Sequence, residues 1–304
     1  MLKDPKARGS RGMNTTTTQA TESPVSDALK VLDQGVANLI ATDGWKNYLR
    51  VQAQFHQYSF NNTLWLMIQG LQRDVAVSRF AGFQTWKKMG RYVRAGEKSF
   101  KVLAPCGYKR TVEKEDGSKE EKFGVRGFKV ASTFDISQTE GPDLPEVAHQ
   151  LQGSDETARE TFTRLADWSG ARGVPISREV TGGSNGYYLR SDNRIAVSDN
   201  LSDIHALKTL CHEVAHSILH ATDEGDSRET KEVEAESTAF VVMTALGFDT
   251  SDYSFGYVAV WSKGSKEAVR AVAGRVQKTA HEILDALSKT PLADRLDRIE
   301  AALA

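Results

Sequence analysis

The chain has 304 residues, of which 39 are basic and 40 acidic, and its formal net charge is −1. A chain of this length can form two domains, and its balanced charge excludes a protein that attracts nucleic acid through its overall field. Its two cysteines cannot form a disulfide framework, so we expect a cytoplasmic protein. No apolar run approaches the roughly 18 residues that cross a membrane, so we expect no membrane partner.

Residues 1–24 are polar and rich in threonine, which predicts a disordered tail. Residues 25–137 are expected to form a first domain of helices and a small antiparallel sheet, because amphipathic stretches precede stretches that are typical of strands. The expected helices cover about 26–40, 45–54 and 62–71, and the expected strands cover 99–104, 108–112 and 123–134. Residues 138–155 are polar and contain two prolines, so they are expected to link this domain to a second one over residues 156–304.

The segment from Arg79 to Arg110 differs from the rest of the chain in charge. It holds nine basic residues against one acid, Glu97, which is a local net charge of +8, and aromatic residues are interleaved with the basic ones. Basic side chains follow phosphates and aromatic rings stack on bases, at about 1 to 3 kcal/mol per base, so this mixture favours single-stranded DNA binding. Two alternatives stay open. Aromatic residues such as Phe83 and Trp86 can belong to the core, and a charge run can be a solvated face.

The order of motifs in this region resembles the ArdC-type single-stranded DNA-binding domain of antirestriction proteins. The resemblance covers about residues 27–137 and consists of Tyr58-Ser-Phe-Asn-Asn62, Phe83-x-x-Trp86-x-x-x-Gly90-Arg-x-Val93-x-x-Gly96-Glu-Lys98 and the strand that ends at Ala104-Pro105. It implies that the first domain binds single-stranded DNA. The residues expected to contact DNA are Tyr58, Asn61, Asn62, Trp86, Lys87, Lys88, Arg91, Arg94, Lys98 and Lys101. The two asparagines could instead cap a helix.

Residues 207–220 contain His212, Glu213 and His216 in the order His-Glu-x-x-His. Apolar residues recur every three or four positions in this stretch, which predicts a helix that packs into a core. On such a helix the two imidazoles lie one turn apart on one face, so both can bind one metal ion. The alternative is a chance match, in which the histidines merely lie on the surface or in a cleft.

A zinc site of the peptidase kind needs a third protein ligand and an open position for water. We expect this ligand from the next helix, at about residues 226–246, where Glu236 is the first choice and Glu232 or Glu234 are the alternatives. Zinc would lower the pKa of its bound water from about 15.7 toward 7. Glu213, next to His212 in the sequence, is the expected general base that takes the proton from this water.

These residues resemble the gluzincin-like zinc peptidases of the ImmA and IrrE type. The match consists of His212, Glu213 and His216 followed by the helical segment 236–240, and it covers about residues 155–250. The resemblance implies a zincin-like α+β fold in which a strand before the zinc helix lines the substrate groove. The strands expected at 187–190 and 194–197 are in the right place for that role, and an edge strand there would hold an extended peptide by main-chain pairing.

Together these observations favour a cytoplasmic α+β protein in which a single-stranded DNA-binding domain precedes a zinc metallopeptidase domain. The similar families imply an antirestriction role on a mobile genetic element. Two other functions stay open. One is a regulatory zinc peptidase that cleaves a repressor and whose first domain binds protein. The other is a DNA-shielding protein in which the zinc site is only structural. The peptide or protein substrate is unknown in each case.

Overall fold

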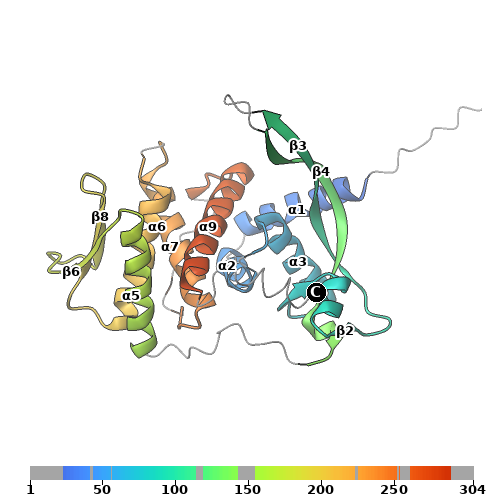
Figure 1. Cartoon of the computed structure of the whole chain (residues 1–304), viewed down its shortest axis with the longest axis horizontal. Coiled ribbons are helices and arrows are strands. Elements are labelled where there is room, and N and C mark those ends of the chain that lie inside the picture. The colour runs from blue at the N-terminus through green and yellow to red at the C-terminus, as the bar shows by residue number, and fades with distance from the viewer. Residues whose placement is uncertain are drawn as a thin grey trace, which may run out of the picture.

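The computed structural model describes residues 23–41, 44–55, 57–113, 119–142, 155–222, 225–251, 253 and 261–288. The fold is α+β, as expected, with helices and small sheets in both halves of the chain (Figure 1). Nearly all of the predicted tail, residues 1–24, and most of the predicted linker, residues 138–155, lie outside the described residues. Within the described ranges, no helix is both long and apolar enough to cross a membrane.

The three helices expected at the start of the chain are confirmed. They are α1 (Pro24–Ala41), α2 (Gly44–Gln54) and α3 (Phe60–Arg73). The cap of α3 is Ser59, whose side chain accepts a hydrogen bond from the Asn62 backbone N–H. The Asn62 side chain instead bonds the backbone of Leu103 on both sides, donating to its carbonyl at 3.0 Å and accepting from its N–H at 2.8 Å. Asn62 therefore ties α3 to a strand.

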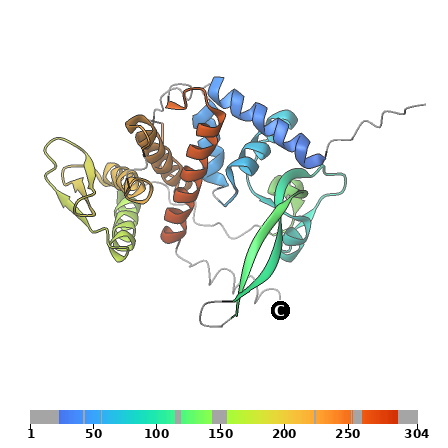
Figure 2. The ribbon, with the colours of Figure 1, turned by 90° about the horizontal axis from the view of Figure 1, so that it is seen from above.

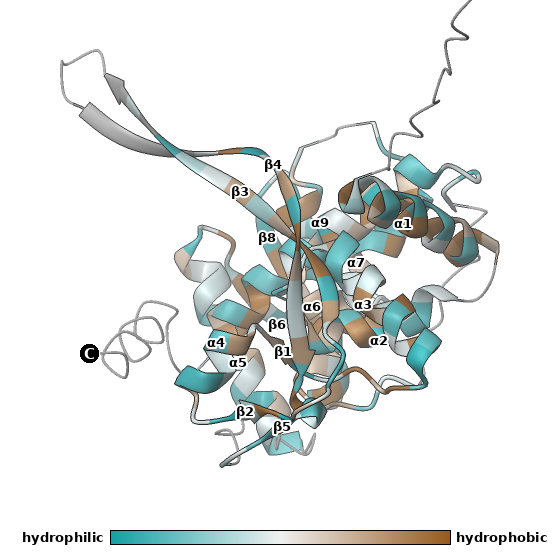
Figure 3. Cartoon of the chain, turned by 90° about the vertical axis from the view of Figure 1, so that its right-hand side faces the viewer, coloured by the Kyte–Doolittle hydropathy of each residue, from teal (hydrophilic) through white to brown (hydrophobic). Residues whose placement is uncertain are grey.

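The longest strands form a single antiparallel hairpin, β3 (Phe100–Glu113) with β4 (Lys119–Asp135). Two shorter strands were expected where β3 runs without interruption. A bulge replaces the expected break, because Pro105 pairs with Phe128 and Gly107 pairs with Val125, which leaves one extra residue in β4. The hairpin projects from the helices as an arm (Figures 1 and 3).

Short elements surround the base of this arm. They are β1 (Phe80–Ala81), which pairs with β4, α4 (Phe83–Lys88), β2 (Tyr92–Val93), a 3-10 turn (Ile136–Gln138) and β5 (Thr139–Glu140), which pairs with β2. The buried carboxylate of Asp135 accepts hydrogen bonds from the backbone N–H groups of Ser78, at 2.8 Å, and Ser137, at 2.9 Å. It thereby holds the end of β4 against β1 and the turn.

The second half of the chain places a small mixed sheet beside a group of helices. Its elements are α5 (Asp155–Ala171), β6 (Ile176–Glu179), β7 (Gly186–Leu189), β8 (Arg194–Ser198), α6 (Asp203–Leu219), α7 (Arg228–Ala245) and α9 (Lys266–Leu287). The strand order is β6-β8-β7, with β6 parallel and β7 antiparallel to β8. The hairpin expected near residues 187–197 is therefore present, and β7 lies at an edge of its sheet.

One hydrophobic cluster joins the two halves. It contains buried residues of α1 and α2 together with buried residues of α6, α7 and α9, and Figure 2 shows α1 beside α9. Trp45 of α2 is 1% exposed, and its indole N–H donates to Ser237 Oγ of α7 at 3.0 Å. The Trp45 ring also contacts that of Trp261, with 5.4 Å between centroids. The division at residues 25–137 and 156–304 stays a prediction, and the two segments share a core.

Because Trp45 belongs to this shared core, Trp45→Ala should destabilise the whole chain. Removing a buried aromatic side chain costs about 3 to 5 kcal/mol. We expect the variant to unfold in one transition, at a lower denaturant concentration than the wild type. Circular dichroism and tryptophan fluorescence, followed in parallel, should report the same transition. Leu71→Ala is the control, because Leu71 is 74% exposed and such a surface change costs within about 0.5 kcal/mol. Two separate transitions, only one of them shifted, would contradict a shared core.

Candidate metal centre

The helix α6 forms as its sequence predicts. Ser202 caps its first turn by accepting from the His205 N–H, and the apolar stripe is buried. Cys211 belongs to this stripe and is 0% exposed, and burial raises the pKa of its thiol to about 12. It is therefore a packed, neutral thiol. His212 and His216 lie on a different side of the helix and remain partly exposed.

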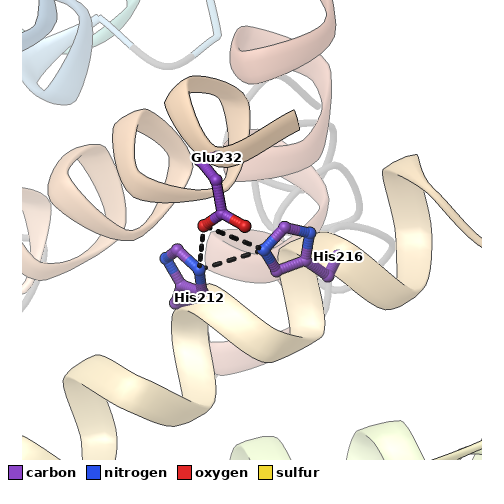
Figure 4. Close-up of side chains that lie close together, drawn as sticks. All are labelled: His212, His216 and Glu232. Atoms are coloured by element: carbon purple, nitrogen blue, oxygen red, sulfur yellow. Dashed lines mark hydrogen bonds and ion pairs between the residues drawn. The ribbon is translucent and has the colours of Figure 1, made fainter. Parts of the chain in front are cut away.

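The two histidines meet one carboxylate of α7. The Nε2 atoms of His212 and His216 are 3.0 Å apart, and Glu232 Oε2 lies 3.4 Å from the first and 3.7 Å from the second (Figure 4). One ligand atom from each residue lies within 4.8 Å of the others. Two imidazole nitrogens and a carboxylate oxygen are a donor set that suits zinc and other first-row metal ions. Among the described residues, this is the group that could hold a metal ion.

Glu236 lies on the other side of the His212 ring. Its Oε2 is 3.1 Å from His212 Nδ1, and its Oε1 is 3.4 Å from Lys208 Nζ. Glu232, one of the two alternatives, therefore lies beside the two Nε2 atoms. Glu236, the first choice, lies beside the outer nitrogen of His212. The two residues are one turn apart on α7, so the sequence alone predicted both on one face.

His216 has an outer partner of its own. Its Nδ1 lies 2.9 Å from His220 Nδ1, and His220 Nε2 lies 2.9 Å from Glu234 Oε2. Glu234 is 0% exposed, and its other oxygen accepts from Arg275 Nε of α9 at 2.6 Å. Such outer contacts orient the rings of metal-binding histidines. Sequence reasoning missed Arg275, because no spacing rule connects α9 with α6.

The carboxylates change the protonation of the histidines. Burial lowers the pKa of His212, but hydrogen bonds with Glu232 and Glu236 outweigh burial and raise that pKa to about 9. Burial lowers the pKa of His216. Hydrogen bonds with the two histidines hold the pKa of Glu232 below its usual range. A metal ion that binds here must displace the proton on His212, since the metal-binding form of imidazole is neutral.

A cleft of about 610 Å³ opens over the two histidines and is lined also by Glu213 and by Tyr187 and Tyr188 of β7. Glu213 is 8% exposed, it accepts a hydrogen bond from the Tyr188 backbone N–H, and burial raises its pKa. A Cβ at Gly186 would lie 2.6 Å from Thr209 Cγ2, so glycine is what lets β7 approach α6 this closely. The strand β7 therefore forms one wall of the cleft, as predicted from the sequence.

Several residues that were predicted to contact DNA are held inside the fold. Trp86 is 1% exposed, and its indole N–H donates to the Phe134 carbonyl at 2.9 Å. Arg91 is 8% exposed, and its guanidinium donates to the hydroxyl of Thr139 at 2.8 Å and to the carbonyl of Gly141 at 3.1 Å. The contacts of Trp86 match the alternative in which it belongs to the core, whereas Phe83, the other ring named in that alternative, is 50% exposed. The ring of Trp86 has no open face on which a base could stack.

Two family profiles match the chain. The N-terminal domain of anti-restriction factor ArdC matches residues 26–135, and the IrrE N-terminal-like domain matches residues 170–255. The chain therefore contains an ArdC-like N-terminal domain followed by an IrrE-like domain. An uncharacterized protein of Bacillus anthracis is 26% identical over 277 residues, a match that covers 78% of this chain and 46% of the relative. The ArdC-like chain thus spans about half the length of this relative.

Two crystal structures of the antirestriction protein ArdC from plasmid R388 are similar to the ArdC-like chain. The metal-free structure is 21% identical, with a TM-score of 0.47, and the match covers 75% of this chain and 84% of that one. The Mn(II)-bound structure is 18% identical, with a TM-score of 0.41, and the match covers 80% of this chain and 98% of that one.

The other predicted DNA contacts of the ArdC-type domain are more accessible. Lys87, Lys88, Arg94 and Lys98 are exposed, whereas Tyr58, Asn61 and Lys101 are half-buried. Arg94 pairs with Glu97 at 2.6 Å. The ammonium of Lys101 donates to the hydroxyls of Ser99 and Ser132, at 2.8 and 2.9 Å. Four exposed basic side chains of the predicted set could therefore reach a polyanion.

Proposed function

We propose that this ArdC-like protein is a zinc metallopeptidase that binds single-stranded DNA through its ArdC-type domain and acts in antirestriction. The observation that supports the peptidase most directly is the cluster of His212, His216 and Glu232 beside Glu213 in an open cleft. The match of residues 26–135 to the ArdC domain supports the DNA-binding part.

Three residues would hold the metal ion and two would support them. We assign His212, His216 and Glu232 as ligands, which leaves a fourth tetrahedral position open as catalytic zinc sites require. Glu236 and His220 contact the outer nitrogens of the two histidines and so orient their rings. A bound zinc ion would polarise the scissile carbonyl and make a water molecule acidic enough to attack it.

The remaining chemistry belongs to side chains and backbone around the cleft. Glu213 accepts the proton of the attacking water and returns it to the nitrogen of the leaving amine, which balances the hydrolysis. Its contact with the Tyr188 N–H keeps the carboxylate at the wall of the cleft. The edge strand β7 offers backbone groups that can pair with an extended peptide, so the substrate would bind as an additional strand.

The peptidase is tested by adding the full-length protein, with zinc, to a mixture of peptides prepared from a cell extract. We expect mass spectrometry to detect new peptide termini when zinc is present. When a chelator is added in place of zinc, no new termini should appear. A recurring sequence around the new termini would define the substrate class. An absence of new termini with zinc bound would contradict hydrolysis and favour the protein that only shields DNA.

DNA binding is tested with single-stranded oligothymidine and a duplex of the same length, by fluorescence anisotropy with the full-length protein. We expect tighter binding of the single strand. The logarithm of the association constant should fall with the logarithm of salt concentration by about 0.7 for each phosphate neutralised. A protein that binds neither nucleic acid would instead support the regulatory peptidase whose first domain binds protein.

A further inference from the structure

The β3–β4 arm has exposed side chains on both faces beyond the part that packs on α3. We call residues 104–109 and 124–129 the outer arm. Side chains alternate along a strand, and residues opposite each other in an antiparallel pair share a face. Tyr108 pairs with Gly124, and the register places it on the same face of the ribbon as Lys129. Phe128 and Val125 lie on the opposite face.

The aromatic and apolar side chains of the outer arm are unusually open to solvent. Phe128 and Val125 are each 57% exposed, and Tyr108 is 36% exposed. A Cβ on Gly124 would lie 2.6 Å from the Tyr108 ring, so the absence of a side chain there lets the ring lie against the opposite strand. Phe128 and Val125 belong to neither hydrophobic cluster of the chain, so their apolar surface is available to a partner.

The charge of the arm indicates the chemistry of that partner. Residues 98–112 and 122–134 contain seven basic and no acidic residues, in a chain whose net charge is −1. Arg126 and Lys129 are exposed, and the Arg126 guanidinium lies 5.8 Å from the centroid of the Tyr108 ring. The arm extends beyond the helices (Figures 1 and 3). Its acidic residues Glu113, Glu115, Asp116, Glu120 and Glu121 lie between these two segments in the sequence, outside the outer arm. A polyanion can therefore approach it without repulsion from carboxylates within these segments.

Rings and cations together favour a single-stranded nucleic acid. Basic side chains neutralise phosphates, and each exposed ring offers a surface for one base, at about 1 to 3 kcal/mol per base. A duplex keeps its bases stacked inside, so it could use the charges but not the rings. Of the two rings in the predicted set, Trp86 is buried and Tyr58 is half-buried, whereas Phe128 and Tyr108 are accessible. Phe83 and Tyr92, near Lys87 and Lys88, are also exposed, so the test compares the outer arm with α4.

We propose that the outer arm is the surface on which this protein holds a single-stranded nucleic acid. Phe128 stacks on a base at one face of the ribbon, and Tyr108 stacks on a base at the other face as the nucleic-acid strand passes around the edge of the ribbon. Arg126 and Lys129 contact phosphates. The inference rests on the proposed DNA-binding function and adds its location. It assigns the contact to the outer arm and not to α4, where Lys87 and Lys88 lie.

The test compares two double variants of the full-length protein in binding to labelled single-stranded oligothymidine. Phe128→Leu with Tyr108→Leu keeps apolar bulk but removes both rings. It should weaken binding by at least about 30-fold, because two stacking contacts contribute at least about 2 kcal/mol together. Phe128→Tyr with Tyr108→Phe keeps both rings and should bind within about twofold of the wild type. All four changes are at exposed positions, so zinc content and the circular dichroism spectrum should stay unchanged.

The charged contacts have a separate signature. Arg126→Gln with Lys129→Gln should reduce the slope of log affinity against log salt by about 1.4, because each lost phosphate contact contributes about 0.7. Lys263→Gln with Lys278→Gln is the matched control, because both side chains are exposed and lie outside the predicted DNA contacts, and it should leave that slope unchanged. Lys87→Gln with Lys88→Gln tests α4 in the same assay. Ultraviolet crosslinking to a bromodeoxyuridine oligonucleotide should label the peptides that contain Tyr108 or Phe128.

The outcomes separate the location from the function. If the wild-type protein binds oligothymidine and the ring-free variant binds it equally well, the outer arm is not the contact surface, while DNA binding itself stands. If only the variant with Lys87→Gln and Lys88→Gln loses affinity and salt dependence, the contact surface is α4 and not the outer arm. If the wild-type protein binds no oligonucleotide at all, the location and the proposed function both fail.

Discussion

Glu232→Gln should lower the affinity of the full-length protein for zinc by more than 100-fold, whereas Glu236→Gln should lower it by only about 10- to 100-fold. The reason is that Glu232 Oε2 faces the Nε2 atoms of His212 and His216, while Glu236 contacts the outer Nδ1 of His212. Loss of an outer partner typically costs about 10- to 100-fold in metal affinity, and loss of a ligand costs more.

Competition with a chromophoric zinc chelator measures both affinities on the same scale. Glu229→Gln is the matched control, because Glu229 is an exposed carboxylate of the same helix, outside the donor cluster. We expect its affinity to equal that of the wild-type protein. A larger loss for Glu236→Gln than for Glu232→Gln would restore Glu236 as the third ligand and would require α7 to turn when the metal binds.

Glu213→Gln should abolish most of the peptide hydrolysis and leave zinc binding intact. A positioned general base contributes about 10²- to 10⁴-fold to the rate, and the amide of glutamine cannot accept the proton. The substitution keeps the size of the side chain and an oxygen that can accept from the Tyr188 N–H. We therefore expect a folded, zinc-loaded protein whose turnover falls by at least about 100-fold.

The turnover of this variant is measured on the peptide mixture, with zinc content determined on the same sample. Glu229→Gln again serves as the control and should hydrolyse peptides at the wild-type rate. Hydrolysis by Glu213→Gln at an undiminished rate would remove Glu213 from the mechanism. A variant that loses both zinc and activity would show that Glu213 acts on the metal site and not on the proton.

The sequence by itself determined those features that depend on local periodicity. The 3.6-residue period of α6 places His212 and His216 on one face, the capping residues define the starts of helices, and the alternating residues of β7 and β8 predict their hairpin. The two resemblances also depended on residues close together in the chain, and the family matches over residues 26–135 and 170–255 agree with them.

Only the tertiary structure decided which side chains meet. Glu232 and Glu236 share one face of α7, so their distances to His212 depend on how α7 packs against α6 and not on spacing in the sequence. Trp86 and Arg91 have the composition of a DNA contact, yet contacts to Phe134 and Thr139, more than 40 positions away, bury both. Periodicity cannot reveal such partners in α4, which has six residues, or in the residues that follow it, because burial depends on what the rest of the chain places over them.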